Sequence, residues 1–214
     1  TTTLTDAAGN ESPQSAALPL TVDTAAPAAP TGVTVTDDVA PVTGAIAANG
    51  ASNDNKPTFA GAAGSAEAGS TITVMDGATV LGTAVVAADG SWSVTPTTAL
   101  ADGAHSITTR ATDAAGNVSP VSPALALTVD TAAPAAPAAP TSTAPSTNDN
   151  TPGIHIGVGL TDTPSLYVDG VKVPATYDPV TGTLTPTTPL GDGVHQFTTT
   201  LTDAAGNESP QSAA

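Results

Sequence analysis

The sequence contains no cysteine, only 3 lysine and arginine residues together, and 2 % aromatic residues. The absence of cysteine excludes disulfide bonds, thiolate metal sites and cysteine nucleophiles. So few basic residues provide no positively charged surface for nucleic acid, and none for an anionic membrane. No apolar run approaches the ~18 residues that a membrane-spanning helix needs, so we expect no direct membrane insertion.

Acidic residues and turn formers are what the sequence has instead. Aspartate and glutamate total 19, the formal net charge is -16, and glycine and proline contribute 20 residues each. This charge favours a positive partner, of which a divalent metal ion is the simplest. Acidic chains with few aromatic residues are often disordered. Here, however, Val, Leu, Ile and Thr occur in short alternating runs between turn residues, which is typical of β-strands.

Internal repetition is the strongest signal in the sequence. Residues 1–17 recur without change as residues 198–214. Shorter blocks recur in the same order: TDAAGN at 5–10, 112–117 and 202–207, VDTAAPAAP at 22–30 and 129–137, NDN-x-P at 53–57 and 148–152, and TPTT-x-L-x-DG-x-H at 95–105 and 185–195. The chain is therefore a series of related modules.

The Ala/Pro-rich blocks predict the module boundaries, because proline restricts the backbone and gives a stiff, extended linker. We expect one complete module at 24–130. Residues 131–214 are predicted to be a second, shorter module that lacks its last strand. Residues 1–23 then correspond to the C-terminal strands of a preceding module.

Each module is predicted to be a β-sandwich without helix, because about seven short strands alternate with turn signals. In the complete module we expect strands within 33–47 and near 58–63, 70–75, 79–87, 91–96, 105–112 and 123–129. Asp76-Gly77 and Asp89-Gly90 predict hairpin turns. The predicted core consists of Phe59, Ile72, Val74, Val85, Trp92, Val94, Leu100, Ile107, Leu125, Leu127 and Val129, and in the second module of Ile154, Ile156, Leu166, Val168, Leu184, Leu190 and Phe197.

Several motifs resemble the bacterial Ig-like tandem repeats of giant adhesins, often secreted by type I systems, that act in biofilm formation and host attachment. The motifs are G-x-x-x-x-A-E-A-G-S-x-I-T-V-x-D-G, DGSWSV, LADGAH, ATDAAGNVS and VDTAAP. The resemblance implies tandem Ig-like Greek-key sandwiches that form the stalk of an extracellular, cell-surface adhesin. It also implies calcium at the joints between neighbouring repeats. The second module departs from the pattern, because it lacks the A-E-A-G block.

The acidic residues can be placed at these joints, because certain loops of an Ig sandwich open at the end where the chain enters. We expect Asp23, Glu67, Asp113 and Asn117 to meet at the first joint. Calcium takes six to eight oxygen ligands of these kinds. At the second joint, the equivalent residues are Asp130, Asp162, Asp203 and Asn207. Asp54, Asp102 or the Asp37–Asp38 pair could reach this joint from the exit end of the first module. In residues 1–23, the equivalents of Asp113 and Asn117 are Asp6 and Asn10.

These motifs also have purely structural explanations. The Asp-Ala-Ala-Gly-Asn segment could be an Asx-type turn, with glycine and asparagine adopting left-handed backbone angles. Asn53-Asp54-Asn55 could likewise be a turn. His105 and His195 occupy matching strand starts, which favours a structural role, and His155 has no ligand-like spacing to a partner.

The sequence therefore predicts a structural extender and not an enzyme, since a joint is repeated in every module whereas an active site rarely is. Its partners would be calcium and the neighbouring repeats of the same chain. The alternative is a module whose loops bind a glycan or a host protein. Residues 18–22 also form an orphan strand, which could pair with the open sheet edge of another copy.

Overall fold

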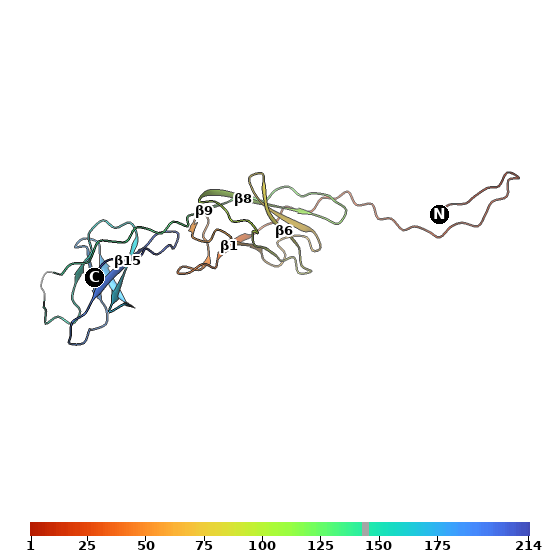
Figure 1. The fold of residues 1–214 in the computed structure, drawn as a ribbon. Helices are drawn as coiled ribbons and strands as arrows, with labels where there is room; N and C mark the ends of the chain where they lie inside the picture. The colour runs from red at the N-terminus through yellow and green to blue at the C-terminus, as the bar shows by residue number, and fades with distance from the viewer. Residues whose placement is uncertain (143–145) are drawn as a thin grey trace.

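The computed structural model describes residues 1–142 and 146–214, and all of its regular structure is β-strand. Figure 1 shows three parts in succession: an extended N-terminal segment, a first module formed by β1 to β9, and a second module formed by β10 to β15. Within the described residues, no helix has the length and apolar character that crossing a membrane requires. The expected all-β class is confirmed.

Two sheets form the first module. The first sheet has the order β2 (Gly44–Ala45), β1 (Val33–Asp37), β4 (Thr58–Gly61), β7 (Trp92–Val94). The second has the order β3 (Ala51–Ser52), β9 (Leu125–Val129), β8 (Gly103–Thr112), β5 (Thr71–Asp76), β6 (Thr79–Val85). The chain crosses repeatedly between the sheets, so residues from the whole module meet in one core. The last strand, β9, lies between an antiparallel partner, β8, and a parallel partner, β3.

The core of the first module matches the predicted one at most positions. Phe59, Ile72 and Ile107 are fully buried, and each lies on the inward side of a strand with alternating burial. Turns with positive φ at the glycine are present at Asp76-Gly77 and Asp89-Gly90. The first closes the predicted hairpin between β5 and β6, but the second lies between β6 and β7, which belong to different sheets, so the hairpin predicted there is wrong. Regular alternation therefore located most of this core: Leu125 packs against it but is only partly buried, and one residue in β6 faces the wrong way.

The exception is Val85, which was predicted to be buried but is 70 % exposed. The register between β5 and β6 shifts at Val74/Met75, so that Val74 pairs with Gly82 while Met75 pairs with Val80. The extra residue, Leu81, reverses the inward and outward positions that follow it. Val86, beyond the end of β6, is buried instead of Val85.

The second module has two smaller sheets. Their orders are β10 (Ile154–His155), β14 (Thr183–Pro186), β13 (Ala175–Asp178) and β12 (Val171–Val173), β11 (Thr163–Val168), β15 (Phe197–Thr202). Leu166, Val168 and Leu184 form its buried cluster, and Ile154 is also buried. The other predicted core residues, Ile156, Leu190 and Phe197, pack against this cluster but are only partly buried. This core is thus more open than that of the first module.

Residues 1–23 lie outside both modules and are almost entirely exposed. They nevertheless form a local turn in which Thr5 and Glu11 make an antiparallel bridge. Backbone bonds join Ser12 N to Leu4 O and Ser15 N to Thr2 O, both at 2.8 Å. The identical sequence at 198–214 makes the same bonds, from Ser209 to Leu201 and from Ser212 to Thr199. This segment's conformation is therefore encoded locally.

Candidate functional site

The repeated Asp-Ala-Ala-Gly-Asn segment forms a turn that its own side chains hold together. Asp113 Oδ1 accepts hydrogen bonds from the backbone N–H of Ala115 at 2.9 Å and of Asn117 at 2.8 Å. Asp113 Oδ2 accepts a third from Asn117 Nδ2 at 2.8 Å. Gly116 has a φ of 92°, which a residue with a side chain rarely adopts,. The Asx-type turn considered from the sequence is therefore present.

The other two copies of the turn have the same geometry. Asp6 and Asp203 each accept bonds from two backbone N–H groups and from the amide of Asn10 or Asn207, all at 2.9 Å. The asparagine side chain is the largest cause that lowers the pKa of Asp6 and Asp113 below the usual value, and backbone N–H groups add to it. The carboxylates of these two turns are thus ionised at neutral pH.

The asparagine of each module connects its turn to the linker. Besides bonding Asp113, Asn117 Nδ2 donates to the main-chain carbonyl of Asp23 at 3.1 Å. In the second module, Asn207 Nδ2 donates to the carbonyl of Asp130 at 2.8 Å and to Asp203 Oδ2. A single amide group therefore bridges the turn and the linker that enters the module. We call this arrangement the asparagine bridge.

At the second joint, loops of the first module also contact the turn of the second. Asn53 N donates to the carbonyl of Ala205 at 2.9 Å. A Cβ added at Gly206 would lie 3.0 Å from Val42 Cβ, a contact so tight that Val42 would have to move to accept a side chain there. Residues 205–207 are buried at this joint, whereas the equivalent residues 115–117 of the first module are not. The joint is thus formed by direct contact between the modules.

Three of the expected metal ligands line one pocket at the first joint. Asp23, Glu67 and Asp113 surround a volume of about 340 Å³. Asp23 Oδ1 accepts the N–H of Ala25 at 3.0 Å, whereas no hydrogen bond to Asp23 Oδ2 or to the Glu67 carboxylate is found in the described part of the chain. Oxygen ligands of this kind suit Ca²⁺. Yet within residues 1–142 and 146–214 no three acidic or histidine side chains converge closely enough to hold a metal ion.

The acidic residues expected at the second joint are more dispersed. Asp130 Oδ1 accepts the N–H of Ala132 in the linker at 3.0 Å, and Asp162 Oδ1 accepts the hydroxyl of Thr161 at 3.3 Å. Asp54 is buried, and its carboxylate accepts the N–H of Lys56 within its own loop and the N–H of Asp38, which follows β1. The structure therefore joins Asp130, Asp203 and Asn207, but it does not bring Asp162 or Asp54 into that group.

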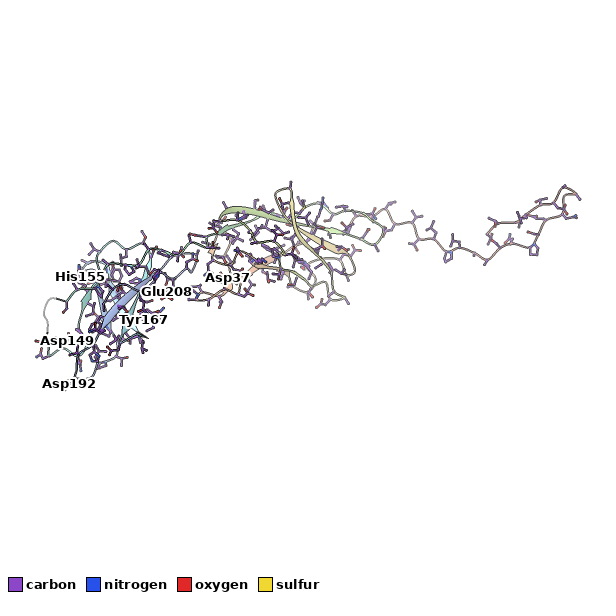
Figure 2. All side chains as sticks on the ribbon, in the orientation of Figure 1. Asp37, Asp149, His155, Tyr167, Asp192 and Glu208 are labelled. Carbon is purple, nitrogen blue, oxygen red and sulfur yellow. The ribbon has the colours of Figure 1, made fainter. Side chains whose placement is uncertain are left out.

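Asp37, one of the Asp37–Asp38 pair that the sequence offered for the second joint, is a buried carboxylate. Asp37, labelled in Figure 2, ends β1 and accepts the hydroxyl of Ser52 at 2.5 Å and the N–H of Val39 at 2.7 Å. Ser52 Oγ in turn accepts the N–H of Asp54 at 3.1 Å. These bonds fix the loop after Ser52, in which Asn53 contacts the second module. The irregular loops that carry Val42 and Asn53 gave no periodic signal that could have predicted these contacts.

Comparisons with known proteins agree with this architecture. The sequence profile of the bacterial Ig-like domain matches residues 29–131 and 139–214. Among solved structures, fibronectin(III)-like modules of CbhA from Clostridium thermocellum are similar, with 16 % identity, 83 % of this chain and 90 % of that chain covered, and a TM-score of 0.44. The BSP domain of a biofilm associated protein aligns with 21 % identity over 78 % of this chain and 28 % of that one, with a TM-score of 0.26.

No match was found among curated protein sequences. The profile nevertheless covers most of the 214 residues and both modules. The two-sheet architecture of each matched range is the one that such domains adopt,. The chain therefore belongs to the bacterial Ig-like domain family.

Proposed function

We propose that this chain is an extender segment of an extracellular bacterial surface adhesin, in which each joint holds successive modules in a fixed orientation. Membership of the bacterial Ig-like family and the repetition of whole modules support this proposal. The same joint chemistry recurs wherever a linker enters a module. A function that depends on length and stiffness requires such repetition, whereas catalysis does not.

The observation that carries the proposal is the asparagine bridge of the second module. The Asn207 amide donates to the carbonyl of Asp130 and to the carboxylate of Asp203. Bonds to a charged acceptor are stronger than neutral ones, at about 1.5–3 kcal/mol. Together with the bond from Asn53 to Ala205, the bridge restrains both bending and twisting of the linker. The joint would therefore be stiff without any added ligand.

The variant Asn207→Ala tests this proposal directly. We expect the second module of the variant to tumble more independently, with a shorter rotational correlation time measured by ¹⁵N relaxation. Asn10→Ala is the matched control, because Asn10 makes the same bonds within its turn but the turn is exposed and packs against neither module. Equal correlation times for the second module in both variants would contradict the role of the bridge.

Calcium is a second component of the proposal, favoured by the pocket of Asp23, Glu67 and Asp113. Free carboxylate oxygens on Asp23 and Glu67 would supply ligands to the ion. The chain's own contribution would be to bring these side chains closer than they lie now, since they do not form a ligand cluster as they stand. Bound calcium would offset their mutual repulsion and stiffen the first joint.

Isothermal titration of the full chain with CaCl₂ tests the calcium component. Extracellular calcium modules have Kd values of ~10⁻⁴–10⁻³ M, and we expect binding in that range. The variant Glu67→Gln should weaken it at least tenfold, whereas Glu11→Gln, in the exposed N-terminal segment, should not. Absence of saturable binding up to tenfold above this range would remove calcium and leave the asparagine bridge untouched.

A further inference from the structure

One outer surface of the first module carries no acidic side chain. It is the outward face of β6, β5 and β8, on which the strand register places Thr83, Thr73 and Arg110 in one row. The rows on either side contain threonine, valine and methionine. Asp76, the acidic residue of β5, alternates to the opposite face, where it meets His105,. We call this outward surface the Arg110 face.

The Arg110 face is apolar along its margins. Val80 and Val85 of β6 are exposed on one side. On the other side of β8, Val118 forms a bridge with Thr112 and is exposed, as is Val121 in the same segment. Single exposed valines are common on protein surfaces, whereas several around one charged side chain are typical of a contact surface.

The side chain of Arg110 has no partner. Arg110 is one of only 3 basic residues in a chain with 19 acidic residues. Within residues 1–142 and 146–214, ion pairs are formed by the histidines and by Lys172, and the half-buried Arg110 guanidinium has neither an ion pair nor a hydrogen bond. Its N–H donors are therefore available to a carboxylate from outside the module.

The equivalent face of the second module is polar. Its strands β15, β11 and β12 have the same order as β8, β5 and β6. The sequence repeat places Glu208 where the first module has Val118, and the strand register places Lys172 where it has Val80. Figure 2 shows Glu208 close to Tyr167, the residue of β11 that contacts it. We call this surface the Glu208 face.

Glu208 presents a charged carboxylate with one free oxygen. Its Oε1 accepts hydrogen bonds from Thr200 Oγ1 at 2.6 Å, Tyr167 Oη at 2.9 Å and Lys172 Nζ at 3.4 Å, whereas Oε2 accepts none from the described residues. The bond from Thr200 is the largest cause that lowers the pKa of Glu208, so the carboxylate is ionised at neutral pH. By contrast, both carboxylate oxygens of Asp178, on the other sheet, are bonded within its own turn.

We propose that the Arg110 face of one copy packs against the Glu208 face of another copy, with the Arg110 guanidinium donating to Glu208 Oε2. Copies with a net charge of -16 repel one another, so a lateral contact requires a surface without acidic side chains,. The Arg110 face meets this requirement. Twisted sheets of like strand order pack face to face at about 10 Å, and their outward side chains interdigitate.

The two faces also complement each other in charge. Arg110 is a base without an acid, and Glu208 has one oxygen bonded to Lys172 and a second without a base. The valines around Arg110 would exclude water from the new pair. An arginine–carboxylate pair shielded in this way binds more strongly than one on an open surface.

The contact would join neighbouring chains side by side. Because the two faces differ, the contact is heterologous, and copies joined in this way can extend sideways into arrays. Extender segments would then adhere to one another along their length, in addition to holding their own modules in line. This contact requires neither calcium nor the adhesin role proposed above, only the fold.

Sedimentation velocity of the full chain tests the contact. A single shielded ion pair supports weak binding, so the measurements should extend to about 1 mM protein. We expect species heavier than the 20.4 kDa monomer that increase with concentration and that Arg110→Glu abolishes. Lys56→Glu is the matched control, because it makes the same charge change at an exposed lysine outside both faces. A parent chain that stays monomeric, or an Arg110→Glu variant that associates like the parent, would overturn the proposal.

Charge reversal identifies the acceptor. Glu208→Arg should also be monomeric, and an equimolar mixture of Glu208→Arg with Arg110→Glu should associate again, because the two chains then offer opposite charges at the paired positions. A mixture of folded chains that stays monomeric would exclude Glu208.

The amide NMR spectrum of Glu208→Arg must first show a folded second module, since this variant loses the bonds to Tyr167 and Thr200. If that module is unfolded, Glu208→Gln keeps the shape of the side chain and should weaken association about threefold. Association of Glu208→Gln equal to that of the parent would then refute the pairing.

A spin label locates the contact. The chain has no cysteine, so Thr83→Cys carries a single nitroxide in the middle of the Arg110 face. When the labelled chain is mixed with ¹⁵N-labelled parent, we expect broadening of the amide signals of β11, β12 and β15 in the parent. Broadening confined to another surface, such as that of β1 and β4, would show that the copies associate elsewhere and would refute the contact.

Discussion

The imidazole Nδ1 of His105 lies 2.7 Å from Asp76 Oδ2. His105 Nε2 faces the carbonyl oxygen of Ala101, also at 2.7 Å, so both ring nitrogens meet acceptors. Only the protonated ring can donate from both nitrogens. The second module repeats the arrangement with His195, Asp169 and the carbonyl of Gly191. The matching histidines predicted to be structural thus fasten one strand to a neighbouring hairpin turn.

The His105–Asp76 pair makes the stability of the first module depend on pH. Burial lowers the pKa of His105, but the bonds to Asp76 and Ala101 outweigh burial and the pKa is raised overall. A histidine in the unfolded chain has a pKa of about 6.5. The stabilisation is therefore complete below that value, and it is lost as the pH rises through the higher folded pKa. We expect urea unfolding, followed by Trp92 fluorescence, to require less denaturant above neutral pH.

The variant His105→Gln should flatten this dependence, because glutamine does not titrate. NMR titration of the ring protons should also give a lower His105 pKa in the variant Asp76→Asn than in the parent. A parent protein equally stable from pH 6 to pH 9 would contradict the argument, since carboxylates complete their titration at lower pH.

A second prediction concerns the two related strands of the chain. Leu127→Ala removes a fully buried side chain and should lower the free energy of unfolding by about 2–5 kcal/mol. Leu20→Ala, at the equivalent position of residues 18–22, should change it by less than about 0.5 kcal/mol in dilute solution. Trp92 is the single tryptophan and lies in the first module, so its fluorescence reports on this module. Equal losses of unfolding free energy in the two variants would contradict the finding that the N-terminal segment is exposed.

A third prediction separates a joint contact from backbone strain. Gly116 and Gly206 have φ angles of 92° and 97°, so alanine should strain both turns by a similar amount, roughly 1–2 kcal/mol,. A Cβ at Gly116 meets nothing within 4 Å, whereas one at Gly206 meets Val42. Small-angle scattering should therefore show altered module orientation only for Gly206→Ala. A matching change in Gly116→Ala would assign the effect to the turn and not to the contact.

The sequence predicted the fold well because local rules governed most of it. Alternating runs located the strands, and the two Asp-Gly pairs located turns, of which Asp76-Gly77 closes a hairpin and Asp89-Gly90 connects the two sheets. The prediction that Val85 is buried was wrong because a bulge at Leu81, four residues earlier, reverses the alternation,. Gly82, beside the bulge, is the kind of strand glycine that marks such an irregularity, but the alternation was followed through it,.

The candidate site was predicted less completely. Repetition correctly grouped Asp113 with Asn117 and with the linker, because loops at one end of a sandwich must lie together. It could not reveal that the asparagine amide donates to a main-chain carbonyl, since that depends on atomic spacing. The structure does not bring the Asp54 carboxylate to the second joint, because the backbone N–H groups of Lys56 and Asp38 already bind it. Calcium binding stays a prediction.

The position of β9 determines how the first module would respond to tension. A pull transmitted through the linker after Val129 acts along the strand itself. β9 is bonded on both edges, to β8 and to β3, and the bonds run across the strand,. They are therefore loaded in shear and must rupture together, whereas a strand pulled sideways unzips one bond at a time. Force along the chain would meet its greatest resistance at this strand.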